Sequence, residues 1–284
     1  MANLKEIRNR ISSVSSTMQI TSAMKMVSAA KLKKAQDAIT AMRPYSNKLS
    51  ELMRGFSSSA EDKTFSKKRD INNALIIAIS SNRGLCGAFN VNVLKEINSL
   101  KLRDEFKNAK INFLTIGKKI NDSLSKEEKI IQNESSLFDN LNYDEVSLVV
   151  NKLMDLFANQ EYDHIEIVYN SFKNAATQII KTEQFLPIST EEAKSTYALN
   201  YIFEPTQEEI IRTLIPKSLK MQLFKAVRDS FASEHGARMT AMHKATDNAS
   251  ELRDELKLTY NKARQASITN EILEIVGGAE ALNG

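Results

Sequence analysis

Residues 17–34 read TMQITSAMKMVSAAKLKK, and because this stretch contains neither Gly nor Pro it is typical of an α-helix. Its apolar side chains do not form one stripe, since Met, Ile, Ala and Val are spread around the helix between Ser, Thr, Gln and Lys. A helix that packs against one partner carries a single apolar stripe. The stretch therefore predicts a helix that meets something besides one partner helix.

A heptad pattern extends from this stretch in both directions. Two series of residues seven apart, one from Leu4 to Met53 and one from Ile7 to Phe56, contain twelve apolar residues among sixteen. Such a pattern predicts a coiled-coil seam. Pro44 is expected to kink the helix or to mark a joint. The polar exceptions on the seam are Thr21, Lys25, Ser28 and Ser46, and the apolar residues beside it in the opening stretch are Ile20, Met24 and Val27.

The C-terminal region contains a second long helical pattern. Thr206 and Glu209 form a capping-box sequence that predicts its start, and Pro216 is expected to kink or restart it. Gly277 and Gly278 are expected to end it. Steps of three and four residues predict a seam of mostly small side chains, which a partner backbone can approach closely. The members of this seam are Met242, Ala245, Ala249, Leu252, Leu256, Thr259, Ala263 and Ala266.

The two helical regions are expected to pair with each other. At about 1.5 Å per residue, helices of roughly 50 to 60 residues are about 80 to 90 Å long. A compact domain of ordinary size cannot bury them, so we expect an antiparallel coiled coil. The predicted domains are an N-terminal coiled-coil helix (residues 1–58), an α/β globular domain (residues 70–204) and a C-terminal coiled-coil helix (residues 206–284).

The middle region alternates between strand-like and helix-like patterns. ALIIAIS (74–80) and INFLTIG (111–117) predict buried strands, and helical spacing follows the first of them in VNVLKEINSL. Alternating strands and helices predict a mainly parallel, Rossmann-like α/β sheet. The stretch at 178–188 predicts an antiparallel edge strand, and residues 62–73 read as a linker. The remaining elements are expected in KIIQNES, DEVSLVVNKLMDLFANQ and HIEIVYNSF.

Composition narrows the class of protein. The net charge of +4 is unevenly distributed, because residues 1–56 carry ten Lys and Arg against three Asp and Glu. A basic helix can meet nucleic acid, anionic lipid or an acidic protein surface. The first fifty residues contain Tyr45 as their one aromatic side chain, which argues against stacking on single-stranded nucleic acid. We find no apolar run of eighteen residues and no secretory signal pattern, and one cysteine excludes an intrachain disulfide.

The strongest enzyme-like feature is the loop SSNRGLCGAFN (80–90), which follows a predicted buried strand and contains Gly84 and Gly87. Phosphates often bind at this place in an open α/β sheet, but neither a G-x-G-x-x-G pattern nor a phosphate-cradling Gly-Lys-Ser/Thr is present. Cys86 lies at a predicted helix start, which can lower a thiol pKa, but no base is identified. A structural turn is the favoured interpretation.

Histidines and the C-terminal end complete the candidate features. His164, His235 and His243 have no metal-ligand spacing, so SEHGARM and MHKATDN are interpreted as contact surface. The final stretch, SITNEILEIVGGAEALNG, carries apolar side chains over a broad arc. If this helix outruns its partner, the apolar end requires another protein to cover it.

With these residues in view, the chain resembles the gamma subunit of the F-type ATP synthase, the central shaft of that rotary motor. The resemblance covers essentially the whole chain and is densest in four blocks. These blocks are ITSAMKMVSAAKLKKAQ (20–36), SNRGLCGAFN (81–90), SEHGARMTAMHKATDNA (233–249) and YNKARQASITNEILEIVGGAEAL (260–282). Gly236 departs from the family pattern, because the family usually has a better helix former there. This predicts that local helix stability is lower by about 1 kcal/mol.

The resemblance implies an architecture, a function and a set of partners. It implies a coiled coil of the terminal helices inserted through a ring of three alpha and three beta subunits, with one shaft per complex. Rotation of the shaft is expected to change nucleotide affinity at the beta subunits and to couple proton-driven rotation of the membrane c-ring to ATP synthesis or hydrolysis. No cofactor, metal, nucleic acid or bond chemistry is expected. The implied location is the cytoplasmic face of the bacterial inner membrane, peripheral and without a spanning segment.

The resemblance also assigns contact residues. For the beta subunits they are Met24, Lys25, Met26, Lys33, Arg264, Gln265 and Thr269. For an apolar bearing at the top of the ring they are Ile268, Ile272, Leu273, Ile275 and Val276, within a tip that reaches Leu282. For the membrane ring and the epsilon subunit they are Tyr201, Phe203 and Glu204, in NYIFEP.

Overall fold

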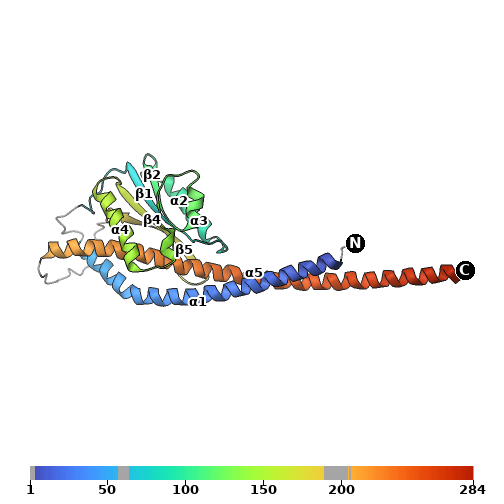
Figure 1. The fold of residues 1–284 in the computed structure, drawn as a ribbon. Helices are drawn as coiled ribbons and strands as arrows, with labels where there is room; N and C mark the ends of the chain where they lie inside the picture. Colours follow the sequence, from blue (N-terminus) through green and yellow to red (C-terminus); the bar gives the residue numbers. More distant parts are fainter. Residues whose placement is uncertain (1–3, 57–63, 189–203, 205, 284) are drawn as a thin grey trace. The chain divides into compact units, whose positions relative to one another are not determined.

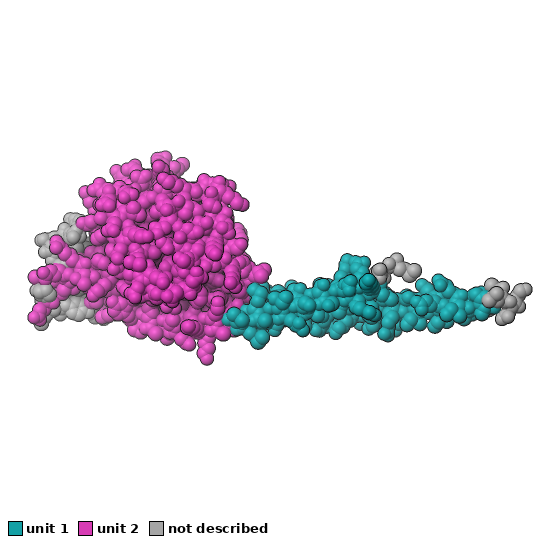
Figure 2. Space-filling model, in the orientation of Figure 1, with its two compact units in different colours: residues 1–27, 239–284 teal, residues 28–238 magenta. Residues whose placement is uncertain are grey.

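The computed structural model describes residues 4–56, 64–188, 204 and 206–283 (Figure 1). The chain divides into two compact units, which Figure 2 colours separately. Unit 1 consists of residues 1–27 and 239–284, and unit 2 consists of residues 28–238. The division into three domains predicted from the sequence stays a prediction.

Two long helices contribute to both units. Helix α1 spans Leu4–Phe56 and helix α5 spans Gln207–Asn283. The hydroxyl of Thr206 accepts a hydrogen bond from the Glu209 N–H at 3.3 Å, which confirms the predicted start of α5. The expected restart at Pro216 and the expected end at Gly277 and Gly278 are wrong, because all three residues lie inside α5.

Packing explains why α5 continues through Pro216. A proline removes one helical hydrogen bond, but Ile211 and Ile215 before it and Leu219 after it are buried in one core. The two glycines near the end cost only about 1 kcal/mol each relative to alanine, which is not enough to end a helix. Pro44 likewise lies inside α1, between the buried residues Ile39 and Leu49.

Unit 2 contains a five-stranded sheet with the strand order β3-β2-β1-β4-β5. The first four strands in this order are parallel, and β5 pairs antiparallel with β4 at the edge, as predicted. Every strand predicted from the sequence is confirmed. The strands are β1 (Asn73–Ile79), β2 (Lys110–Ile116), β3 (Ile130–Asn133), β4 (His164–Phe172) and β5 (Gln178–Leu186).

Helices cover both faces of this sheet, which explains the continuous apolar run in β1. On one face, Ala74, Ile76 and Ala78 pack in a core with α2 (Phe89–Lys101), α3 (Lys118–Leu124) and the short helix η1 (Asp104–Phe106). On the other face, the intervening residues of β1 pack with α4 (Tyr143–Ala158), with η2 (Ser135–Phe138) and with α5 from Ile211 to Val227. Figure 1 shows α4 and α5 on this side of the sheet. The predicted α/β class with long terminal helices is thus confirmed.

Unit 1 is an antiparallel helix pair with a fixed register. The Arg8 guanidinium donates to the Tyr260 hydroxyl at 2.7 Å, and Lys25 Nζ lies 3.4 Å from Nδ1 of His243. These two contacts are separated by seventeen residues on each helix. Between them, the Thr246 hydroxyl donates to the Thr21 hydroxyl at 2.8 Å. The helices therefore stay paired through the polar part of the predicted seam.

The seam of α5 differs from the prediction at every second position. Met242 and Ala249 are buried as expected, but Leu252 is 46% exposed. The hydrogen bonds to α1 come from Thr246, Arg253 and Tyr260, each one residue after the predicted Ala245, Leu252 and Thr259. A heptad accepts a step of three followed by four as readily as the reverse, so local spacing cannot distinguish these positions. The seam is therefore less dominated by small residues than predicted.

Candidate interaction surface

The first predicted contact patch lies on α1 within unit 1. Met26 is 65% exposed, and the neighbouring Ile20 and Val27 are exposed apolar side chains as well. Met24 is half-buried, and Lys25 is half-buried beside His243 of the partner helix. The surface that α1 leaves open here is therefore apolar. Of the assigned residues in this stretch, Met26 is the most accessible to a partner protein.

Lys33, the remaining assigned residue on α1, belongs to unit 2. Its side chain is exposed, as are those of Lys31 and Lys34, whereas Leu32 and Ala35 are buried. The helix therefore turns its cations outward at this point. A basic face of this kind suits an acidic protein surface.

The second predicted patch lies on α5, where Arg264, Gln265 and Thr269 are all exposed. The Arg264 guanidinium makes no hydrogen bond or ion pair with any residue that the structure describes, so its donors are free to meet a carboxylate. The Thr269 hydroxyl donates to the Gln265 carbonyl oxygen of its own helix at 2.9 Å. Arg264 is therefore the strongest polar anchor of this patch.

The register of unit 1 keeps the two patches apart. His243 lies beside Lys25, and Arg264 follows His243 by twenty-one residues along α5. At about 1.5 Å per residue this separation is roughly 30 Å. The structure therefore does not bring the α1 patch around Met26 together with Arg264. A partner that meets both must present two separate surfaces.

The C-terminal end of α5 extends past the paired part of unit 1. The register places Leu4, where α1 begins, opposite Arg264, and α5 continues to Asn283. Exposure is high along this extension, reaching 72% at Ile275. The side chains of Ile268, Ile272, Ile275 and Val276 share one helix face because they follow the spacing i, i+4, i+7 and i+8. Leu273 is exposed beside this stripe.

The predicted contact with the membrane ring falls mainly outside the described residues. Tyr201 and Phe203 belong to that part of the chain, and Glu204 is exposed. The loop after β1, by contrast, is fully described. It lies at the carboxyl ends of the parallel strands, next to the point where the strand order reverses between β1 and β4. Ligands often bind at this place in open α/β sheets.

The loop after β1 supplies hydrogen-bond acceptors to the first N–H groups of α3 at this edge. The first N–H groups of α3 point at the loop, and they donate to the Asn82 side chain, the Ser81 carbonyl oxygen and the Ser80 hydroxyl at 3.1, 3.1 and 3.0 Å. Gly117 permits this approach, because a β-carbon there would lie 2.4 Å from the Ser80 carbonyl oxygen. The first N–H groups of α3, which could hold a phosphate, are thus already satisfied.

A buried ion pair on α5 holds the same loop in place through hydrogen bonds, and it was not predicted from the sequence. The Arg238 guanidinium donates to the carbonyl oxygens of Arg83 and Gly84 at 2.9 and 3.2 Å and pairs with Glu234 at 2.6 Å. Burial raises the pKa of Glu234, and Arg238 partly offsets this shift. The only sequence signal was a Glu and an Arg four residues apart in SEHGARM. Reading SEHGARM as contact surface is wrong, because Ser233, Glu234, His235 and Arg238 are buried.

Cys86 and the histidines have structural surroundings. Cys86 is buried, and burial raises the pKa of its thiol, so the lowered pKa considered from the sequence is wrong. His235 is buried against the Phe231 ring, with 4.5 Å between ring centroids, whereas His243 is exposed near Asp247. Among the residues that the structure describes, no cluster of His, Cys, Asp and Glu has the arrangement of a metal site.

The fold and these surfaces define a class of protein, an α/β domain inserted between two long helices that carry exposed apolar and basic side chains. A family profile described as ATP synthase matches residues 3–282. The ATP synthase gamma chain of Flavobacterium psychrophilum is 64% identical to this chain over 288 residues, and that of Cytophaga hutchinsonii is 50% identical over 294 residues. Both alignments cover all of each chain. The chain belongs to the ATP synthase gamma chain family, which is the non-catalytic stalk subunit of that complex.

Solved structures share the fold. A chain in the cryo-EM structure of the Euglena gracilis mitochondrial ATP synthase rotor matches with a TM-score of 0.70 and 19% identity, covering 93% of this chain and 98% of that chain. A chain in the structure of the OSCP/F1/c-ring part of the same enzyme matches with a TM-score of 0.72 and 21% identity, covering 98% and 94%. Both of these structures are of ATP synthase assemblies.

Proposed function

We propose that the chain is the rotating central shaft of a proton-translocating F-type ATP synthase. It couples rotation of the membrane c-ring to conformational changes of the catalytic beta subunits during ATP synthesis or hydrolysis. The chain itself makes and breaks no bonds. The observation that carries the proposal is the end of α5, which continues from Arg264 to Asn283 with an exposed apolar stripe.

An exposed stripe of this kind is costly for a protein that stays alone. Isolated apolar side chains on a surface are normal, but a continuous stripe marks a contact with another molecule. A collar of alpha and beta subunits, three of each around one shaft, would cover Ile268, Ile272 and Ile275. An apolar collar can hold an apolar tip while it turns, because the hydrophobic effect has no preferred direction.

The remaining contacts follow from charge and exposure. Met26 and the exposed Lys33 on α1, and Arg264 with Gln265 on α5, are proposed to meet the moving parts of the beta subunits, with Met24, Lys25 and Thr269 beside them. Glu204, together with Tyr201 and Phe203, is proposed to meet the epsilon subunit and the c-ring. Unequal patches on a turning shaft would present a different surface to each beta subunit in turn.

The proposed location is the cytoplasmic face of the bacterial inner membrane. None of the helices that the structure describes has an apolar stretch long enough to cross a bilayer. Attachment to the membrane would therefore come through the c-ring. The proposal includes no bound cofactor.

A photo-cross-linking experiment tests the shaft against a static scaffold. A benzoyl-phenylalanine at the exposed position of Gln265 would join the chain to a neighbouring beta subunit when the assembled complex is irradiated. A rotating shaft predicts that ATP turnover stops in proportion to the cross-linked fraction. A scaffold predicts unchanged turnover, and that result would refute the proposal. The same complex kept in the dark provides the control.

A further inference from the structure

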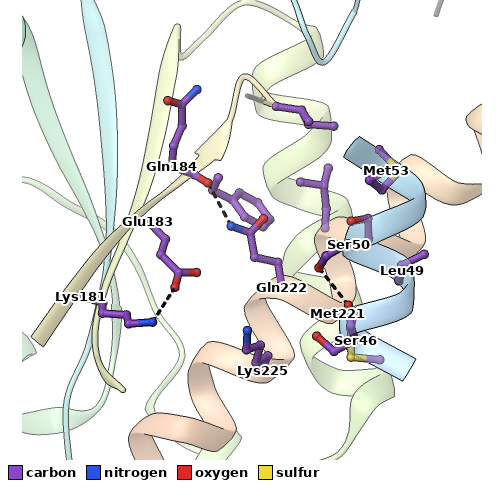
Figure 3. Close-up of a pocket in the computed structure, with 14 residues that line it drawn as sticks. Ser46, Leu49, Ser50, Met53, Lys181, Glu183, Gln184, Met221, Gln222 and Lys225 are labelled. Atoms are coloured by element: carbon purple, nitrogen blue, oxygen red, sulfur yellow. Dashed lines mark hydrogen bonds and ion pairs between the residues drawn. The ribbon is translucent and has the colours of Figure 1, made fainter. Parts of the chain in front are cut away.

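A polar hollow lies within unit 2, where α1, β5 and α5 meet (Figure 3). It has two adjoining parts of about 440 and 320 Å³, and both are lined by Ser46, Lys181 and Lys225. Figure 3 shows Lys181 and Glu183 on the strand side, Gln222 and Lys225 on α5, and Ser46 and Ser50 on α1. None of these residues belongs to the contact patches described above.

One end of the hollow is cationic. Arg43, Lys181 and Lys225 line the smaller part. The other residues that line it are Asp229, the polar Ser46, Asn47 and Ser171, and the apolar Ile39, Met42 and Phe172. Neither Arg43 nor Lys225 makes a hydrogen bond or ion pair within 4.0 Å of any residue that the structure describes. Two cations without a close protein partner converge on one polar space, and a bound anion would satisfy them.

The carboxylates near this end already have protein donors. Glu183 accepts from the Tyr169 hydroxyl at 2.7 Å and lies 3.9 Å from Lys181. Asp229 accepts from the Ser171 hydroxyl at 3.3 Å and is buried. Burial raises the pKa of Asp229, and Lys225 and Arg43 partly offset the shift, which places both cations near this carboxylate. With three cations and two carboxylates, the end keeps an excess positive charge.

The other end of the hollow is apolar. Its walls come from Met53 of α1, from Phe185 and Ile188 around the end of β5, and from Leu219 and Met221 of α5. Ser218, Gln184 and Gln222 line the same part, and Gln222 is held by a 3.0 Å hydrogen bond to the Gln184 carbonyl oxygen. The hollow thus offers charged, neutral polar and apolar groups to one ligand, as ligand sites commonly do.

We infer that this hollow binds an organic phosphate, with the phosphate between Arg43, Lys181 and Lys225 and the less polar part of the ligand against Phe185, Ile188 and Leu219. A soluble nucleotide and a phospholipid headgroup share this chemistry. The inference does not rest on the proposed function, because none of the residues involved belongs to the proposed contact patches.

Calorimetry on the purified full-length chain tests the site with two probes. One probe is ADP, and the other is dihexanoyl phosphatidylglycerol below its micelle concentration. We expect at least one probe to bind with one-to-one stoichiometry, and its identity distinguishes a nucleotide from a lipid. If neither probe binds, the inference is wrong.

Charge-neutralising variants locate the binding. Arg43→Gln combined with Lys225→Gln should weaken binding at least tenfold, whereas Lys107→Gln, at an exposed lysine outside the hollow, should leave it unchanged. Lys181→Gln provides a second test at an exposed position that is safe for folding, and circular dichroism checks each variant. Binding that survives both the double variant and Lys181→Gln would place the ligand elsewhere and overturn the inference.

Discussion

The carbonyl oxygen of Ala175 lies against Gly236, 3.0 Å from the position that a β-carbon on this residue would occupy. Ala175 belongs to the turn between β4 and β5, where its neighbour Asn174 accepts hydrogen bonds from the N–H groups of Ala176 and Thr177. Gly236 therefore does not interrupt α5. It allows the turn to pack directly on the helix backbone.

Replacing Gly236 by alanine should not give the usual stabilisation. The higher helix propensity is worth about 1 kcal/mol, but the new methyl group must displace a backbone oxygen that the turn holds in place. We expect Gly236→Ala to lower the midpoint of urea unfolding. Gly277→Ala is the matched control, because its β-carbon would meet open space, and it should raise amide protection near the end of α5. An equal gain in stability from Gly236→Ala and Gly277→Ala would contradict this explanation.

The buried His235 predicts a loss of stability at acidic pH. Burial, with Arg238 and Lys31 nearby, lowers its pKa to about 4 from an ordinary 6.5. The unfolded chain therefore binds a proton in this range that the folded chain does not, so stability should fall as the pH drops from 6.5 towards 4, by up to about 3 kcal/mol. His235→Phe should remove this part of the pH dependence in urea titrations, whereas His243→Gln, at an exposed position, should retain it.

The Glu234 and Arg238 pair should behave as a coupled unit. Arg238→Met leaves a buried carboxylate without its partner and two carbonyl oxygens of the loop after β1 without their donor. We therefore expect the free energy of unfolding to fall by about 3 kcal/mol or more. Adding Glu234→Gln removes the stranded charge and should restore part of the loss. A double-mutant cycle by urea unfolding measures this coupling. Simple additivity would show that the pair is not coupled.

The apolar tip should matter for assembly and not for folding. Ile275 is exposed, so Ile275→Asp should change the free energy of unfolding of the isolated chain by no more than about 0.5 kcal/mol. A charge in an apolar collar is costly, so recovery of the assembled ATPase with this variant should fall at least tenfold. Leu102→Asp, at a side chain that is 82% exposed in unit 2, is the control. Normal assembly of both variants would remove the tip from the proposed contacts.

Arg264 should separate assembly from coupling. Because its guanidinium has no partner among the described residues, Arg264→Ala should leave the stability of the chain unchanged. If the side chain carries part of the contact with the beta subunits, ATP hydrolysis should become less tightly coupled to proton pumping while the complex still assembles. Arg264→Lys keeps the charge but loses the two-pronged geometry, so an intermediate effect is expected. Unchanged coupling in both variants would count against the assignment.

Periodicity predicted the elements of this fold well, because local patterns encode them. The alternation of buried strands and amphipathic helices from Asn73 to Leu186 contains enough information to place every strand. The helix-breaking residues Pro216 and Gly277 led to wrong predictions of where the C-terminal helix restarts and ends. In each case the preference of one residue opposes many contacts or a long helix. At Pro216 the buried contacts outweigh a cost of about 3 kcal/mol, and at Gly277 a cost of about 1 kcal/mol is too small to end the helix.

Contacts between distant parts of the sequence account for the rest. SEHGARM contains charged residues, which favour a surface position, but the loop at Arg83 and the turn at Ala175 bury it from far away in the sequence. The seam of α5 depends on which residues of α1 lie opposite, and that register is set by pairs such as Arg8 with Tyr260. A single sequence read locally contains neither relationship. The apolar tip was predicted from the sequence pattern, whereas the other candidate contact residues came from family resemblance, and exposure now ranks those that the structure describes.

The paired hydroxyls of Thr21 and Thr246 add little binding energy, but they have a consequence for alignment. Sliding one helix past the other by one heptad would remove this bond, and each hydroxyl would keep only the bond to a carbonyl oxygen of its own helix, so the cost is about 0.5 to 1.5 kcal/mol. A purely aliphatic seam would tolerate such slippage far better. The polar pair thus fixes the register of the two helices. A twisting force applied to one helix would therefore pass to the other without slippage between them.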